Sequence, residues 1–275
     1  MSEISEEIYL EGLLGKGAFC DVYMAKCSSS DELYAVKTLS DQYEVNSFEW
    51  ILRREFEVLQ HFDHPCIIKA FGLMRVLGDK LGLVLEYVEG PLFHHFSLRE
   101  KFIPFLECRL LSLLETIDVL NAENIIHGDI KPENVFASIT ESNNRVKLID
   151  FGASSYIDLE NNKINQFDFA TPVYSPLRWG LEGVIHPYKL DFFSWSLMIL
   201  QGLSGFDLKS NKKDLMCAIE RNEMKCLFDF LKSKEKASSV DLNCFAKMVN
   251  ALSLNYKPHS LSKECYLTEY RKALV

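Results

Sequence analysis

Apolar and polar residues alternate along the first part of the chain, and the pattern then changes to a helical period. Between residues 47 and 62, apolar side chains recur every three or four positions and polar ones occupy the other face, which predicts an amphipathic helix. Alternating runs bounded by glycine or short polar turns predict strands on both sides of this helix. These strands are expected at Tyr9–Leu14, Asp21–Lys26, Leu33–Leu39, Ile67–Val76 and Leu81–Tyr87.

The later part of the chain has mostly helical periodicity. Leucines spaced three or four residues apart predict a buried helix over Phe105–Asn121, and residues 189–203 and several segments after residue 213 also fit helices. A strand-rich region followed by a helix-rich region predicts an α+β fold, with the division at the pattern break of residues 88–91. The expected parts are a first lobe of residues 1–85, a hinge of residues 86–90 and a second lobe of residues 91–275.

Composition narrows the class of protein. The chain has 275 residues, of which 48% are hydrophobic, enough for a sizeable buried core. Its net charge of -9 argues against nucleic acid or an anionic membrane as the main partner. The longest apolar stretch, Phe192–Leu200, is too short to span a bilayer, and no signal peptide is expected. The eight cysteines form no C-x-x-C pair, so we expect reduced thiols in the cytoplasm or nucleus.

A glycine-rich turn, Gly15-Lys16-Gly17-Ala18-Phe19-Cys20-Asp21-Val22, separates the first two predicted strands. Glycines let backbone amides approach phosphate groups, because no Cβ stands in the way. Cys20 occupies the place where a third glycine would be expected in a phosphate-binding loop. A plain hairpin turn is the alternative interpretation. A Rossmann turn is excluded, since a strand follows the loop where a helix would be required.

A lysine and a glutamate each stand among apolar residues. Lys37 follows Tyr34-Ala35-Val36 on a predicted strand, and Glu55 lies four residues from both Ile51 and Leu59 on the apolar face of the predicted helix. A buried charge without a partner is costly. We therefore predict that Lys37 pairs with Glu55 and is held against nucleotide phosphates, with a solvent-exposed edge-strand lysine as the alternative.

The most specific chemical pattern is His127-Gly128-Asp129-Ile130-Lys131-Pro132-Glu133-Asn134, followed by Asp150-Phe151-Gly152. This spacing suits phosphoryl transfer from ATP. Asp129 would accept the proton of a substrate hydroxyl, and Lys131 would offset charge on the transferred group. Asn134 and Asp150 would bind magnesium ions. Each residue alone could cap a turn, but the joint pattern argues against a chance loop.

Taken in order, these motifs and the segment Thr171-Pro172-Val173-Tyr174-Ser175-Pro176 resemble those of eukaryotic protein kinases over nearly the whole chain. The resemblance implies a bilobal kinase fold over residues 1–275 that binds ATP and Mg²⁺ in the cleft between its lobes. Lys131 and Thr171 resemble those of serine/threonine kinases, whose substrates are proteins bearing serine or threonine. Asp191 resembles the buried aspartate that anchors the catalytic loop of the family.

The resemblance also implies which residues bind the nucleotide. Val22, Ala35 and Phe136 would sandwich the adenine, and residues 86–88 would hydrogen-bond its edge. The implied nucleotide-binding set is Leu14, Gly15, Lys16, Gly17, Ala18, Phe19, Cys20, Asp21, Val22, Ala35, Lys37, Glu86, Val88 and Phe136.

The chain departs from the family pattern at several positions. Gly128 replaces the arginine that usually precedes the catalytic aspartate, so the cationic pocket for a phosphorylated activation loop lacks its main member. We therefore expect activity that does not depend on phosphorylation between Ala153 and Thr171. Leu177 replaces the glutamate of the A-P-E motif, and Lys257-Pro258 stands where Arg-Pro is usual, so both members of a buried pair are altered together.

Gly128, Phe48-Glu49-Trp50 and Asp191-Phe192-Phe193 are weakly similar to the mitotic checkpoint kinases of the Bub type, which would imply cell-cycle or spindle-checkpoint signalling. Two alternatives to an active protein kinase stay open. A pseudokinase that acts as a nucleotide- or partner-binding scaffold would be expected to lack a catalytic or metal-binding residue, and none is lost. A small-molecule kinase would not need residues 171–176, which resemble a peptide-docking segment. The sequence carries no signal for an oligomeric state.

Overall fold

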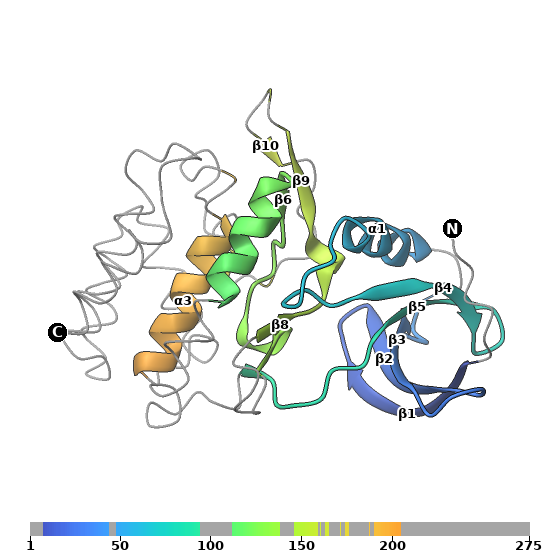
Figure 1. Ribbon diagram of the computed structural model, residues 1–275. Helices are drawn as coiled ribbons and strands as arrows, with labels where there is room; N and C mark the ends of the chain where they lie inside the picture. The colour runs from blue at the N-terminus through green and yellow to red at the C-terminus, as the bar shows by residue number, and fades with distance from the viewer. Residues whose placement is uncertain are drawn as a thin grey trace. The chain divides into compact units, whose positions relative to one another are not determined.

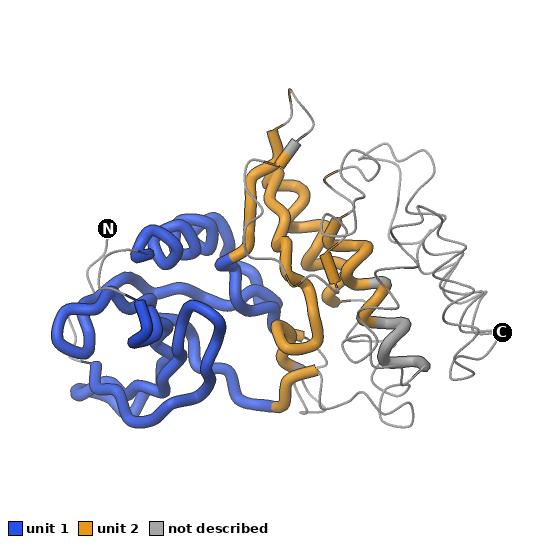
Figure 2. The backbone as a smooth tube through the Cα atoms, turned by 180° about the vertical axis from the view of Figure 1, so that it is seen from behind, with its two compact units in different colours: residues 1–90, 147–152 blue, residues 91–146, 153–275 orange. Residues whose placement is uncertain are grey.

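The protein forms two compact units, drawn blue and orange in Figure 2. The first contains residues 1–90 and 147–152, and the second contains residues 91–146 and 153–275. Grouping of residues 147–152 with the first unit was not expected from the sequence, and the predicted lobe boundaries stay a prediction. The computed structural model describes residues 8–43, 48–93, 112–137, 146–158, 160, 163–164, 171, 174–175, 187 and 190–204.

The first unit is built on a five-stranded antiparallel sheet with the strand order β1-β2-β3-β5-β4 (Figure 1). Its strands are β1 (Ile8–Lys16), β2 (Cys20–Cys27), β3 (Leu33–Leu39), β4 (Ala70–Val76) and β5 (Lys80–Glu86). The five predicted strands are confirmed, with small changes at their ends. Ile67 lies outside β4 and instead forms an isolated parallel bridge with Leu148 of β8 (Val146–Leu148).

One helix, α1 (Glu49–Leu59), packs against strands β3, β4 and β5 of this sheet (Figure 1). It is shorter than the predicted 47–62, but its buried face is the predicted one. Glu55 is buried within that face together with apolar side chains that include Ile51, Leu52 and Phe56. The opposite face of the sheet holds a separate apolar cluster around Val36, because successive strand residues point to opposite sides.

The second unit contains the other described elements. Residues 112–122 are helical and lie beside α3 (Leu190–Ser204) in both views (Figures 1 and 2). A small sheet with the order β10-β9-β6 packs through Ile126, Ile157 and Leu190 onto the start of α3. The remaining elements are β6 (Ile125–Ile126), η2 (Pro132–Asn134), β7 (Val135–Ala137), β9 (Ser155–Asp158) and β10 (Lys163–Ile164). The short helix η3 (Phe151–Ala153) begins in the first unit and ends in the second.

The helices of this unit follow the sequence pattern where they are described. Residues 112–122 confirm the later part of the predicted 105–121 helix, and α3 confirms the predicted helix at 189–203. Residues 105–111 and the helical segments expected after residue 213 lie outside the described residues. Among the described helices, none is long and apolar enough to cross a bilayer.

Candidate active site

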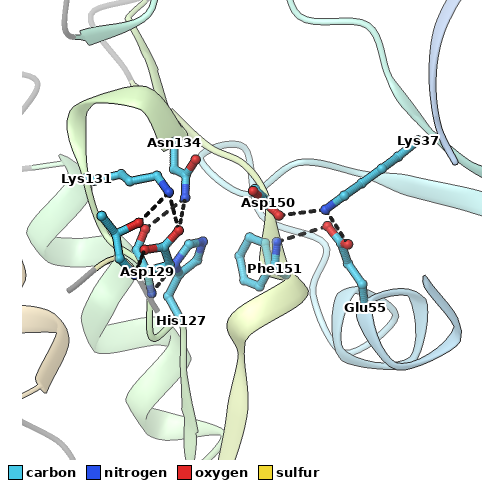
Figure 3. Close-up of polar contacts among 9 residues, drawn as sticks. Lys37, Glu55, His127, Asp129, Lys131, Asn134, Asp150 and Phe151 are labelled. Atoms are coloured by element: carbon cyan, nitrogen blue, oxygen red, sulfur yellow. Dashed lines mark hydrogen bonds and ion pairs between the residues drawn. The ribbon is translucent and has the colours of Figure 1, made fainter. Parts of the chain in front are cut away.

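One group of charged residues lies in the first unit and centres on the ammonium of Lys37 (Figure 3). Nζ of Lys37 lies 2.6 Å from Oε2 of Glu55 and 2.6 Å from Oδ1 of Asp150. Lys37 comes from the central strand β3, Glu55 from α1, and Asp150 follows β8. The predicted Lys37–Glu55 pair is therefore formed. The edge-strand interpretation of Lys37 is wrong, because β3 is the central strand and this side chain is only 9% exposed.

Burial and charge act in opposite directions on these groups. Burial lowers the pKa of Lys37, but the carboxylates of Asp150 and Glu55 outweigh it and raise the pKa above its ordinary value, so Lys37 is an ammonium ion. Burial raises the pKa of Glu55, and Lys37 and the backbone N–H of Phe151 partly offset this effect. The Phe151 N–H donates to Oε1 of Glu55 at 3.0 Å. Each oxygen of this buried carboxylate therefore has its own donor.

Asp150 differs from Glu55 in that water reaches it. Its side chain is 44% exposed, and its backbone has a φ of 63°, in the left-handed region that non-glycine residues seldom adopt. Gly152 lies against this pair, since an added Cβ would be in van der Waals contact with Oδ1 of Asp150 at 3.4 Å and with Nζ of Lys37 at 3.6 Å. The carboxylate is thus oriented by Lys37 on one oxygen and remains accessible.

The glycine-rich segment is the turn of the hairpin between β1 and β2, in which Gly15 faces Val22 across the strands. Gly17 is required by this turn, since its N–H donates to the carbonyl of Cys20 at 2.7 Å and an added Cβ would lie 2.8 Å from the same oxygen. Gly15 has no atom within 4 Å of an added Cβ. The segment forms a hairpin, which both interpretations require, and phosphate binding by its amides stays a prediction.

Cys20 fits its place without the third glycine. Its backbone lies outside the left-handed region, so this position of β2 does not need glycine. The side chain is buried and pairs in register with Leu39. Burial raises the pKa of the Cys20 thiol to about 12, so the thiol is protonated and unreactive at neutral pH.

Residues just after β3 fasten the tip of the glycine-rich turn. The Ser40 hydroxyl donates to Oδ1 of Asp21 at 3.0 Å, and the Ser40 N–H donates to the Phe19 carbonyl at 3.0 Å. The Tyr43 hydroxyl donates to the Ala18 carbonyl at 3.1 Å, and its ring stacks on Phe19 at 5.6 Å between centroids. The Asp21 carboxylate is therefore engaged with Ser40, and the turn is held by the strand that carries Lys37.

A second group of polar residues lies in the second unit and centres on the carboxylate of Asp129 (Figure 3). Oδ2 accepts hydrogen bonds from Nζ of Lys131 and, at 3.1 Å, from Nδ2 of Asn134. Oδ1 accepts the backbone N–H of Thr171 at 2.8 Å. A carboxylate offers about four lone-pair sites, so this network fixes Asp129 and leaves one site on Oδ1 for a further donor.

The loop that carries Asp129 is anchored from α3. Asp191 is fully buried and accepts the N–H of His127 at 2.7 Å and that of Gly128 at 2.9 Å. Burial raises the pKa of Asp191, while His127 and the two backbone donors act against this rise. Gly128 has a φ of 79°, which glycine adopts without strain. Asp129 in turn donates its N–H to Nδ1 of His127 at 3.2 Å.

Asn134 and Asp150 offer the oxygen ligands that Mg²⁺ prefers. The amide nitrogen of Asn134 donates twice to Asp129, at 2.9 and 3.1 Å, which identifies Oδ1 as the amide atom directed away from Asp129. Asp150 has an accessible carboxylate with one oxygen on Lys37. Hard carboxylate and amide oxygens of this kind fit magnesium, which usually keeps several waters and shares its ligands with phosphates. The two residues belong to different units.

The residues expected around adenine are divided between the units. Val22 and Ala35 lie on adjacent strands, and Glu86 and Val88 lie at and after the end of β5 in the same unit. Phe136 belongs to β7 of the second unit. The residues from Leu14 to Ala18 are exposed. Contact of any of these with adenine stays a prediction.

Two supporting pairs were missed by sequence reasoning. In the first pair, the Glu86 carboxylate lies 2.8 Å from Nζ of Lys147. In the second, the Asp21 carboxylate accepts a hydrogen bond from the Ser40 hydroxyl. Each pair joins residues far apart in the chain, and the only signal was a charged residue at the end of an apolar strand.

Some residues singled out in the sequence lie outside the described part of the chain. These are Pro172, Val173, Leu177 and Lys257-Pro258.

Comparison with known proteins agrees with this geometry. The chain is 30% identical over 223 residues to mitogen-activated protein kinase kinase 9 of Arabidopsis thaliana, covering 75% of this chain and 68% of that protein. It is 30% identical over 197 residues to Aurora kinase A-B of Xenopus laevis, covering 70% of this chain but only 46% of the relative. Mitogen-activated protein kinase kinase 8 of Arabidopsis thaliana is 27% identical over 242 residues.

These relatives are kinases by name, and the chain spans less than half the length of the Aurora kinase. The protein kinase domain family matches residues 9–264, which is almost the entire chain. With its strand-rich first unit and the helices of its second, the chain has the predicted α+β kinase fold and belongs to the protein kinase domain family.

Proposed function

We propose that this chain is an active serine/threonine protein kinase that transfers the γ-phosphoryl group of Mg-ATP to a serine or threonine hydroxyl of a protein. The observation that carries the proposal is the network that fixes Asp129. Lys131, Asn134 and the Thr171 N–H hold three of the lone-pair sites of its carboxylate. The remaining site on Oδ1 suits a proton acceptor for an incoming hydroxyl.

The other residues have matching roles in this proposal. Lys37, kept cationic by its two carboxylate neighbours, would bind phosphate oxygens of ATP. Lys131 would offset negative charge on the transferred phosphoryl group. Asn134 and Asp150 would hold magnesium, which neutralises phosphate charge when bound. Catalysis would then come from positioning and electrostatic stabilisation, since phosphoryl transfer needs little covalent chemistry from the protein.

Serine/threonine specificity is supported by the contact between Lys131 and Thr171. Nζ of Lys131 donates to Oγ1 of Thr171 at 2.7 Å, and the Thr171 N–H binds Asp129. The two residues whose identity resembles serine/threonine kinases thus contact each other and the proposed base. Both lie in the second unit, so the contact is internal to that unit.

A cell-cycle or spindle-checkpoint role of the Bub type is part of the same proposal and rests on sequence features alone. These are Gly128, the run Phe48-Glu49-Trp50 and Asp191-Phe192-Phe193. The relatives described above belong to other subfamilies. A cytoplasmic or nuclear location is also proposed, supported by the buried thiols of Cys20 and Cys66, which form no disulfide.

The proposal is tested by transfer of radiolabelled γ-phosphate with magnesium and mixed protein substrates. Asp129→Asn keeps the size of the side chain but removes the charged acceptor, so it should lower transfer by about 100-fold or more. Asp31→Asn is a matched control on the surface, since the Asp31 side chain is 97% exposed. Native and control proteins should be equally active, and phosphoamino-acid analysis should detect phosphoserine or phosphothreonine.

Equal signal from the native protein and Asp129→Asn would refute the enzymatic proposal. Binding of Mg-ATP without transfer by any variant would instead favour the pseudokinase. Transfer only to small molecules would favour the small-molecule kinase. Circular dichroism of each variant separates loss of the carboxylate from loss of the fold.

A further inference from the structure

The first turn of α1 carries a charged pair that the proposed mechanism does not use. Glu49 begins the helix and is only 8% exposed. Both of its carboxylate oxygens accept hydrogen bonds from the guanidinium of Arg75 in β4, through Nη1 to Oε1 and through Nη2 to Oε2 at 3.3 Å. A two-bond arrangement of this kind fixes distance and orientation together.

Arg75 also extends the connection into the turn between β4 and β5. Its Nη1 donates to the Asp79 carbonyl at 2.7 Å, and its Nε lies 3.7 Å from Oδ1 of Asp79. The guanidinium therefore bridges the start of α1 and the end of the β4 strand. The N-cap residue of this helix, Phe48, makes no side-chain cap bond. Arg75 attaches this end of the helix to β4, which a cap bond within the helix would not do.

The same helix carries Glu55, six residues after Glu49. Six residues correspond to about 9 Å along a helix axis, and a helix of this length moves largely as one body. Displacement of the first turn would therefore displace the carboxylate that holds Lys37 and the Phe151 N–H. We propose that Arg75 is a positioning residue, which sets α1 so that Glu55 meets Lys37. This inference deepens the proposed kinase function and rests on it for its effect on catalysis.

The anchor lies wholly within the first unit. It would hold α1 without any contribution from a phosphorylated segment. This agrees with the expectation, drawn from Gly128, that activity does not depend on phosphorylation between Ala153 and Thr171.

Arg53 provides a matched control for Arg75. It also contacts Glu49, with Nη2 3.4 Å from Oε2, and it is about as exposed, at 46% against 44% of the side chain. Arg53, however, belongs to α1 itself and joins the helix to no other element. Arg75→Met and Arg53→Met therefore each remove a guanidinium from the same carboxylate, which loses two hydrogen bonds in the first variant and one in the second. Only the first variant also breaks the attachment of this carboxylate to β4.

Two readouts should respond to Arg75→Met. Hydrogen exchange of the Phe151 amide should become faster, because this N–H donates to Glu55 and is protected only while Glu55 is in place. The kcat for phosphoryl transfer should fall by about tenfold or more with a smaller change in KM for ATP, because loss of the Lys37–Glu55 geometry affects positioning. Arg53→Met should stay within about twofold on both readouts. Arg75→Lys, which keeps the charge but only one donor group, should fall between them.

Native exchange at Phe151 and native kcat in Arg75→Met would overturn the inference, as would equal effects of the two Met variants. If Arg75→Met does not fold, Arg75→Lys and Glu49→Gln carry the same comparison with Arg53→Met. The exchange measurement also separates the two proposals. Should the native protein transfer no phosphate, exchange at Phe151 would still report whether Arg75 positions α1.

Discussion

Replacing Lys37 by methionine should destabilise the protein as well as inactivate it. The change removes one cation from between two carboxylates, which differ greatly in exposure. Asp150 is 44% exposed and can be hydrated by water, but Glu55 is fully buried and would keep only the Phe151 N–H. Breaking a buried ion pair by removing one partner costs about 3–5 kcal/mol. Two unit charges about 4 Å apart at an effective dielectric constant of 20 interact by about 4 kcal/mol, which is the same size.

The assay is equilibrium unfolding, by denaturant and by heat, of the native protein, Lys37→Met, Glu55→Gln and the double variant. A loss of 3–5 kcal/mol should lower the unfolding midpoint of Lys37→Met by roughly 6–20 °C for a domain of this size. The double variant Lys37→Met with Glu55→Gln should recover most of this loss, because no uncompensated charge is then buried. Glu55→Gln alone keeps an acceptor for Phe151 and leaves Lys37 paired with Asp150.

The dependence on pH provides an internal check. Lys37 lowers the pKa of Glu55 against the effect of burial, so its removal should raise that pKa further above the unfolded value. The folded state then binds more protons than the unfolded state, and stability falls as pH rises from the unfolded pKa towards the folded one. The deficit of Lys37→Met should therefore be smaller at pH 5 than at pH 8. Equal midpoints for the native protein and Lys37→Met at pH 8, or a double variant as unstable as the single one, would refute this reasoning.

Three further predictions follow from the glycine-rich turn. Gly17→Ala should raise KM for ATP by about tenfold or more, because the added Cβ would lie 2.8 Å from the Cys20 carbonyl oxygen. Gly15→Ala, the control, should have little effect on KM. Similar KM values for the two variants would count against the steric argument. Ser40→Ala should lower the free energy of unfolding by about 1–3 kcal/mol, because the buried Asp21 carboxylate loses the Ser40 hydroxyl as a donor. Thr38→Val removes a buried hydroxyl with no hydrogen-bond partner, so it should be neutral or stabilising. With a thiol pKa of about 12, Cys20 should be alkylated by iodoacetamide far more slowly in the native protein at pH 8 than in guanidinium chloride. Peptide mapping measures both rates, and equal rates would show that the burial argument is wrong.

Local patterns were sufficient to predict the elements that carry Lys37 and Glu55. The alternation around Lys37 and the helical period around Glu55 come from contacts with one sheet and one core, and both leave a period in the sequence. A charge inside each apolar pattern then required a partner of opposite sign. That requirement predicted a contact between residues 18 positions apart, which the structure forms at 2.6 Å.

Pairs without such a requirement could not be predicted. Arg75 looks like an outward-facing residue of a strand, and Glu49 like an ordinary acidic residue in the first turn of a helix. Each could be satisfied by water, so neither pattern demanded a partner. The backbone conformation of Asp150 was equally hidden, because a left-handed φ at an aspartate depends on tertiary contacts and not on local preference. The sequence therefore predicts residues that would be costly if left alone, and misses contacts that are only favourable.

The two units fix their reactive aspartates by the same device. In each, a fully buried carboxylate on a helix accepts backbone N–H groups next to the functional residue: Glu55 binds the N–H of Phe151, directly after Asp150, and Asp191 binds those of His127 and Gly128, directly before Asp129. Both loops contain a left-handed residue at this place. At Asp150, which is not glycine, this conformation is strained and persists only where its surroundings determine it. The buried carboxylates hold the loops in place, because moving either loop would take backbone donors away from a buried charge. The buried carboxylates of Glu55 and Asp191, which would destabilise the protein if left without donors, thus position Asp150 and Asp129.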